Sequence, residues 1–269
     1  VMKKYLFSIT VTVLTVLGVV AQEKIEVMRY EYEATFKPSI KSDEMFTESV
    51  FLDVWDTSSR FYSKGYATRV ERLAKKENSG LIGKSFSMAG EQTRLEAVLV
   101  KEANKLFYVQ NVSGTMLKIE SPVNQVKWNI DDTVEEFEGM KVQKAIGELN
   151  GRNWTVWFTS EIPIIEGPYK FKNLPGFVVK AQDDKEDYVF EFRKSEKVEI
   201  PVDFNEYKQA GLYKTSELVK LREVKANMTV KQNLDSQGMI VYFEDTVENQ
   251  QMLNKKVGNS SNYLEWLKK

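Results

Sequence analysis

The chain has 269 residues, of which 38 are lysine or arginine and 39 are aspartate or glutamate, and it contains neither cysteine nor histidine. Their absence excludes disulfides, Ser–His and Cys–His nucleophile pairs, and zinc sites built from thiolate or imidazole. The formal net charge of −1 indicates neither a basic surface for nucleic acid nor a charge-driven partner.

The first residues have the pattern of an export signal. Lys3 and Lys4 form a basic start, an apolar run follows, and Val19, Val20 and Ala21 make a small-residue cleavage site. The run of about sixteen residues is short for a membrane span of about twenty, although an uncleaved anchor is the alternative. We expect a signal peptide over residues 1–21, and a mature chain exported to the periplasm or the cell surface that meets the membrane only through this segment.

Alternation of apolar and polar residues predicts β-strands along most of the mature chain, because successive strand side chains point to opposite faces. The clearest examples in the first half are Tyr30–Lys37, Val50–Trp55 and Lys105–Val112. Between them, residues 70–77 have the spacing of a short helix and residues 80–90 the composition of a loop. Residues 95–100 fit either a helix or a strand.

Turn signals divide the centre of the chain. Asp131 and Asp132 predict a turn, residues 135–142 a strand that passes through Gly139, and Asn150-Gly151 gives the strongest hairpin signal in the sequence. In the strand after that hairpin, Trp154 and Trp157 have opposite parity, so they face opposite ways. One of them is expected in the core, and the other either faces a ligand or is covered by a helix.

The last third of the sequence combines a further strand pair with patterns typical of helices. Residues 177–182 and 188–193 form a further strand pair with a polar loop at residues 183–186. After Pro201 the pattern indicates a helix over residues 216–224. Residues 239–243 fit an edge strand, and residues 263–267 fit a short terminal helix.

Together these elements predict a mainly β fold. We expect a single, strongly curved antiparallel sheet or half-barrel, with short covering helices and a helical C-terminal segment; a two-sheet β-sandwich is the alternative. The expected division is an antiparallel β domain over residues 22–200 and a helix-containing extension over residues 201–269 that packs on the same domain.

The region over residues 123–193 resembles the GLPGLI family, whose central peptide stands here as NLPGFV, from Asn173 to Val178. Matching pieces upstream occur in the family's order: Trp128–Ile130, Glu138-Gly139, Lys144-Ala145, Gly151-Arg152, Trp157–Thr159, Glu161–Pro163 and Gly167–Phe171. The chain departs from the pattern at Asn173, which replaces glycine, and at Phe177 and Val178, which replace leucine and isoleucine. The resemblance implies export from a Bacteroidetes-type cell, a β-rich body and no assigned biochemical role.

Two proline–glycine corners frame the centre of this signature. Pro175-Gly176 has the order of a type II turn, in which glycine supplies a positive φ, and Gly167-Pro168 forms a second corner. Either these corners turn the chain between strands and bury Phe171, Leu174 and Phe177, or they present a segment at the rim of a cleft. In the second case Tyr169 and Phe171, together with Trp157, would contact a ligand.

Acidic residues near the signature admit two interpretations. Glu161 and Glu166 could act as a carboxylate pair if they faced each other, but solvated or salt-bridged side chains are the simpler expectation. Asp183–Asp187 lacks the alternating spacing of a calcium loop and reads as a solvated turn. No residue is assigned a catalytic role, and no metal or cofactor is expected.

Three functional classes remain. The favoured one is a non-enzymatic exported binding or carrier protein for an apolar or amphipathic ligand, which predicts a cavity lined by aromatic side chains with few charges. A structural or protein-interaction module of the cell envelope predicts an exposed apolar patch instead. A carboxylate-dependent hydrolase predicts two buried carboxylates in one cleft, at least one of them with a raised pKa.

Overall fold

The structure is a computed structural model that describes residues 24–40, 42–68, 93–95, 97–112, 115–201, 207, 210–226, 246–247, 262 and 264. Several predicted segments lie outside these residues: the signal peptide, the helix at 70–77, the loop at 80–90, the strand at 239–243 and most of the helix at 263–267. Among the described residues, no helix has the length and apolar character needed to cross a membrane.

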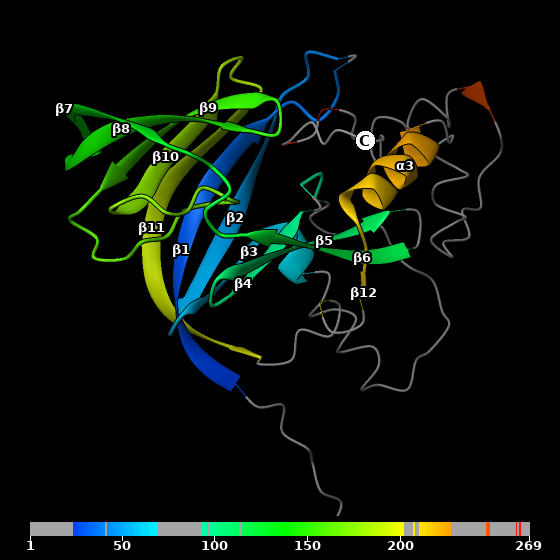
Figure 1. Ribbon diagram of the computed structural model, residues 1–269, viewed down its shortest axis with the longest axis horizontal. Helices are drawn as coiled ribbons and strands as arrows, with labels where there is room; N and C mark the ends of the chain where they lie inside the picture. The colour runs from blue at the N-terminus through cyan, green and yellow to red at the C-terminus, as the bar shows by residue number, and fades with distance from the viewer. Residues whose placement is uncertain are drawn as a thin grey trace, which may run out of the picture.

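One open, curved sheet of twelve strands forms the body of the protein, as Figure 1 shows. The elements are β1 Lys24–Phe36, β2 Phe46–Trp55, β3 Ser58–Ser63, β4 Val98–Glu102, β5 Lys105–Val112, β6 Thr115–Pro122, β7 Asn129–Phe137, β8 Met140–Leu149, β9 Arg152–Thr159, β10 Phe177–Asp183, β11 Tyr188–Pro201, β12 Gly211–Leu212 and α3 Thr215–Ala226. Their order across the sheet is β12-β6-β5-β4-β3-β2-β1-β11-β10-β9-β8-β7. All neighbours are antiparallel except β12 and β6, so the predicted mainly β, single-sheet fold is confirmed.

The central hairpins follow local turn chemistry. Asn150 and Gly151 have φ values of 47° and 84° and join β8 to β9, as predicted. Glu138 and Gly139 adopt the same backbone form between β7 and β8, so the expected continuous strand over residues 135–142 is wrong. The turn predicted at Asp131-Asp132 is also wrong. These residues lie inside β7, where the pairing with β8 is irregular between Ile130 and Val134.

The sheet buries side chains on both faces. The inner face carries the main core, which includes Tyr32, Leu52, Phe61, Trp154 and Phe190. The outer face carries a smaller cluster over β2 to β5, with Phe51, Tyr62 and Phe107 among its members. The stretch over residues 95–100, left open by the sequence, leads into β4, where Leu99 enters the main core and Val98 and Val100 enter the smaller cluster. Strand β7 forms one edge of the sheet and is exposed along most of its length.

The connection between β9 and β10, residues 160–176, crosses the inner face and is called the inner segment below. Phe171 packs against Trp154 of β9, with ring centroids 4.5 Å apart. Tyr169 packs against Phe61 of β3 and Tyr108 of β5, at 6.3 and 6.4 Å. Because these partners come from opposite halves of the sheet, the inner segment fills the space that the curvature creates.

The part after Pro201 also contacts the sheet. The predicted helix is present as α3, in which Leu218 is buried and Arg222 donates a hydrogen bond of 3.0 Å to Tyr108 Oη on β5. Asn262 is buried as well. It accepts a bond of 2.7 Å from Arg152 and donates one of 2.8 Å to the Lys37 carbonyl, so residues distant in sequence meet at the end of β1.

Candidate functional site

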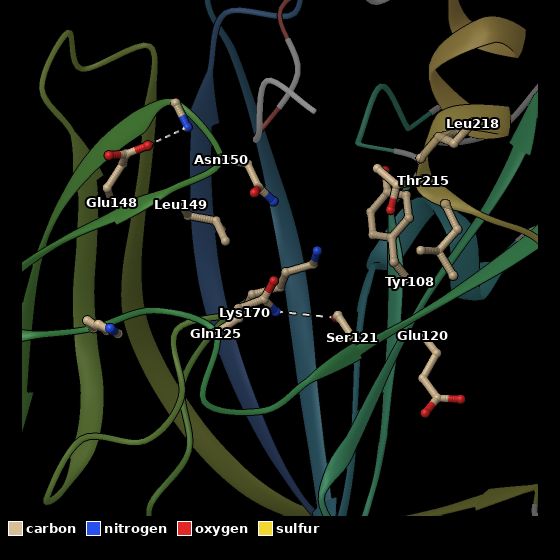
Figure 2. A pocket seen from close by; sticks show the side chains of 13 residues that line it. Tyr108, Glu120, Ser121, Gln125, Glu148, Leu149, Asn150, Lys170, Thr215 and Leu218 are labelled. Atoms are coloured by element: carbon tan, nitrogen blue, oxygen red, sulfur yellow. Dashed lines mark hydrogen bonds between the residues drawn. The ribbon is translucent and has the colours of Figure 1, made fainter. Parts of the chain in front are cut away.

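A cavity of about 660 Å³ opens on the inner face between β5 and β6, the β8–β9 turn, the inner segment and the start of α3 (Figure 2). Its buried floor consists of Tyr108, Ile119, Leu149, Lys170 and Leu218. Its rim is polar and more exposed, and includes Glu120, Ser121, Gln125, Lys127, Glu148 and Asn150. The cavity therefore combines an apolar floor, one buried cation and a hydrophilic entrance.

Local bonds fix the rim. Glu148 Oε1 accepts the Gly151 N–H at 3.0 Å, which closes the β8–β9 turn beside the cavity. Gln125 Nε2 donates to Ser121 Oγ at 3.3 Å, and both bonds are drawn in Figure 2. Glu120 pairs with Lys105 at 2.9 Å. The entrance is thus built from a tight hairpin turn, the end of a paired strand and the β6–β7 connection, which carries Gln125 and Lys127.

The backbone of the inner segment determines the position of Lys170. Tyr169 has a φ of 49°, and the Phe171 N–H donates to the Pro168 carbonyl at 3.1 Å, so the chain turns sharply around Lys170. The residue is 5% exposed. Its ammonium lies 5.6 Å from the ring centroid of Tyr108 and 5.8 Å from that of Tyr169. A cation is therefore held at the cavity floor against two aromatic rings.

A buried ionic cluster anchors the same segment. Glu166 accepts from Lys101 at 2.5 Å and from Ser59 Oγ at 3.2 Å, and it also pairs with Lys172. Lys172 Nζ donates to the Gly167 carbonyl at 2.6 Å. Burial alone would raise the pKa of Glu166, but the ammonium groups of Lys172 and Lys101 hold that pKa below its usual value. Glu166 is therefore an ionised anchor between the inner segment and strands β3 and β4.

The two glutamates considered as a carboxylate pair do not converge. Glu161 is exposed and accepts the Lys141 N–H at 3.0 Å near the β7–β8 hairpin, whereas Glu166 lies within its lysine cluster. Neither residue lines the cavity. These two side chains consequently do not form the arrangement that glycoside hydrolysis requires.

The structure separates the three predicted contact residues. Tyr169 and Phe171 are both 0% exposed, so the expectation of a presented rim segment is wrong; the alternative, corners that bury Phe171, Leu174 and Phe177, is what the structure shows. Trp157 is half-buried on the outer face. Its Nε1 donates to Glu135 at 3.3 Å, and the ammonium groups of Lys144 and Lys180 lie 5.6 and 5.4 Å from its ring. A binding role for Trp157 stays a prediction.

At the two proline–glycine corners, backbone atoms of neighbouring segments pack closely against the glycines. Gly176 does not have a positive φ, so the predicted type II turn is wrong, and the left-handed residue is Asn173, with a φ of 64°. A Cβ at Gly176 would lie 2.3 Å from the Thr159 carbonyl oxygen. One at Gly167 would lie 2.5 Å from the Phe171 carbonyl oxygen. Glycine is required at both positions because backbone approaches backbone, with Pro168 and Pro175 as the adjoining rigid residues.

The acidic turn between β10 and β11 is only partly solvated. Asp183 is buried, pairs with Arg152 and accepts the Tyr188 N–H at 2.8 Å, which corrects the expectation of a fully solvated loop. Burial raises the pKa of Asp183, and the Tyr188 N–H and the Arg152 guanidinium oppose that rise. Within the described part of the chain, no group of three or more Asp or Glu side chains is placed to hold a metal ion.

Sequence reasoning missed the cavity. Its lining comes from five separate stretches of chain, and neither periodicity nor spacing brings such stretches together. One signal was available: Lys170 and Lys172 alternate with Tyr169 and Phe171 inside a segment framed by rigid corners. A charged side chain in a segment that must be buried has to reach either a partner or a cavity.

Comparison with known proteins relates part of the chain to a family without a known function. The model of a family described as "Protein of unknown function (Porph_ging)" matches residues 98–180. No curated protein matches the chain. The fold and the family match thus define a β-rich protein that is similar, in part of its length, to a family without a known function.

Solved structures give weak likenesses. A structure of PNGF-II in space group P21 aligns with a TM-score of 0.47 at 13% identity, over 73% of this chain and 33% of that chain. A second PNGF-II structure, in space group C2, gives 0.48 and 12% over 83% and 36%. An uncharacterised conserved protein from Thermus thermophilus gives 0.32 and 9% over 69% and 90%. The chain spans about a third of the PNGF-II chains, and none of these scores supports a functional argument.

Proposed function

We propose that this protein is a non-enzymatic binding or carrier protein that takes an amphipathic ligand into the cavity. The observation that carries the proposal is the division of the lining into an apolar floor, with Ile119, Leu149 and Leu218, and a polar rim. A volume of about 660 Å³ is in the range of small-molecule sites. A ligand with one apolar and one polar part would match both regions of the lining.

The same observations narrow the range of ligands that the cavity could hold and the part of the inner face that a ligand could occupy. The carrier for an apolar or amphipathic ligand was expected to have a cavity lined by aromatic side chains with few charges, but this lining has one aromatic residue, Tyr108, and four charged ones. The rest of the inner face is occupied by Tyr169 and Phe171 of the inner segment. The proposed ligand therefore occupies the cavity between the hairpin turn and α3, and not the whole concave side of the sheet.

The proposal is tested by blocking the entrance. Ser121→Trp places a large ring at the half-buried rim, and Ser195→Trp, on the exposed part of β11, is the matched control. Native mass spectrometry of protein purified from the cell envelope should show a bound small molecule in the wild type and in Ser195→Trp, but not in Ser121→Trp. Equal occupancy in all three proteins would contradict binding in this cavity.

A protein-interaction module of the cell envelope is the second candidate. It is favoured by strand β7, whose outer backbone edge has no neighbouring strand in the described sheet and on which Ile130 and Val134 are 39% and 59% exposed. An extended segment of a partner could add to such an edge. In the same mass spectrometry experiment, a stable heteromer without a bound small molecule would support this candidate over the carrier.

Export and family membership complete the proposal. The basic start, apolar run and small-residue site of residues 1–21 support secretion to the periplasm or the cell surface. The NLPGFV peptide and the matched pieces upstream support membership of the GLPGLI family. N-terminal sequencing of the secreted protein should give a first residue near Gln22, and retention of the segment would contradict cleavage.

A further inference from the structure

We propose that strand β7 binds an extended segment of a partner protein that carries lysine or arginine side chains and adds to the sheet as a further strand. The inference deepens the second candidate function, the interaction module, by naming the chemistry of the partner. It is separate from the carrier function, because no residue of β7 lines the cavity. Three properties of β7 carry it: its place in the sheet, its exposed apolar side chains and its charge.

The place of β7 leaves part of its backbone directed away from the sheet. It is the last strand in the order of the described sheet, at the border that Figure 1 shows on the left, and it pairs with β8. Alternate N–H and C=O groups of an edge strand point away from its neighbour and can pair with another chain. The pairing with β8 is regular from Val134 to Phe137, so this stretch has the backbone that an added strand can follow.

Apolar side chains are exposed at this border. Ile130 and Val134 of β7 are 39% and 59% exposed, and Ile146 on the neighbouring strand β8 is 54% exposed. Every residue of β7 except Glu135 and Phe137 is exposed. A strand that paired with β7 would remove part of this apolar surface from water while its backbone made hydrogen bonds.

The charge of β7 indicates which kind of segment would pair with it. The strand contains Asp131, Asp132, Glu135 and Glu136, and neither lysine nor arginine. Glu135 pairs with Lys144 at 2.5 Å, whereas the other three acidic residues make no ion pair with any described residue. The border therefore carries uncompensated negative charge, which attracts a cationic segment and repels an anionic one.

Acidic side chains and irregular pairing also protect edge strands from unwanted association. In β7 the irregular pairing lies between Ile130 and Val134, so it leaves the stretch up to Phe137 regular. Protection by charge depends on the sign of the approaching chain. The carboxylates that oppose an acidic strand favour a basic one, so the same residues exclude some partners and select others.

The test is a fluorescence-anisotropy titration of the full-length protein with three labelled nine-residue peptides, which have the length of β7. The first alternates lysine and valine. The second alternates glutamate and valine, and the third keeps the lysines but has proline in place of each valine, which removes those N–H donors. We expect the lysine–valine peptide to bind about tenfold more tightly than either of the others. Hydrogen exchange should show that this peptide protects backbone amides of β7.

A pair of variants locates the binding surface. Val134→Lys adds a positive charge at an exposed position of β7 and should weaken binding of the lysine–valine peptide about fivefold. Leu212→Lys is the matched control, because Leu212 is 65% exposed on β12, at the opposite end of the sheet order. It should bind the peptide as the wild type does. Thermal unfolding shows whether each variant is folded, and the comparison of peptides on the wild type needs no variant.

The outcomes distinguish this inference from the two candidate functions. Equal binding of the lysine–valine and glutamate–valine peptides would overturn the basic class and leave strand addition standing. Equal binding of the lysine–proline peptide, or no protection of β7, would overturn strand addition. A dimer of this chain that protects β7 in the absence of peptide would replace the partner by a second copy. Failure of all three peptides to bind would overturn the inference and leave the carrier function, which Ser121→Trp tests separately.

Discussion

Two lysine–glutamate pairs of the same chemistry lie in opposite surroundings. At the exposed end of the β1–β11 pair, Lys197 and Glu26 lie 3.0 Å apart with side chains 67% and 65% exposed. On the inner segment, Lys172 and Glu166 form a second pair, the inner pair, with side chains 2% and 5% exposed. Water screens the exposed pair, so it contributes little, whereas breaking the inner pair leaves a buried charge. The inner pair therefore fixes the position of a segment, and the exposed pair mainly keeps the surface soluble.

The largest expected effect tests the inner pair. Glu166→Gln removes the carboxylate that faces Lys172 and Lys101, so two ammonium groups lose their shared partner. We expect a loss of about 3–5 kcal/mol in the free energy of unfolding, measured by urea denaturation. Glu161→Gln, on an exposed residue of the same signature, is the matched control and should change stability by less than about 0.5 kcal/mol.

Acid titration gives a second measurement on this variant. The pKa of Glu166 is lowered in the folded protein, so its contribution is present above the usual value of 4.5 and is lost as the pH falls through the folded pKa. The stability difference between wild type and Glu166→Gln should narrow below about pH 4.5. A difference that stays constant down to about pH 3 would show that the carboxylate charge is not what holds the inner segment.

The second prediction compares aromatic residues on the two faces. Phe171→Ala removes a ring that packs on Trp154 and Phe190 in the core, and should cost about 3–5 kcal/mol. Trp157→Ala removes a larger ring, but one that is half-buried on the outer face, and should cost about 1 kcal/mol. Equal losses in denaturation experiments would show that the inner segment is not part of the main core.

The smallest effect concerns the exposed pair, Lys197 and Glu26. Lys197→Ala should change the free energy of unfolding by less than about 0.5 kcal/mol, because both partners are well exposed. Raising the salt concentration should reduce even this difference. A loss comparable to that of Glu166→Gln would remove the distinction between the exposed pair and the inner pair.

Much of the fold could be predicted because it depends on local pattern. Alternation located β1, β2 and β5, and Asn150-Gly151 located the β8–β9 turn, since the side-chain period and the turn backbone are properties of a few adjacent residues. Local pattern failed at Asp131-Asp132, where pairing with β8 keeps two aspartates inside an irregular strand.

The candidate site could not be predicted from local sequence patterns. Whether Tyr169 and Phe171 face solvent or core depends on what the inner segment meets, and its partners, Phe61, Tyr108 and Trp154, lie far away in sequence. The same holds for Glu166, whose partner Lys101 is 65 residues distant. Proline and glycine revealed that the segment bends, but not that it turns inward.

Strand β7, which has one neighbouring strand among the described residues, has a consequence for how molecules of this protein meet. Asp131, Asp132 and Glu136 are exposed on that strand. Two copies that approached through this strand would bring like charges together, and the resulting repulsion opposes the continuous strand addition by which open sheets form fibrils. A lysine-rich segment would meet attraction at the same place, so this border discriminates between self-association and pairing with a basic chain.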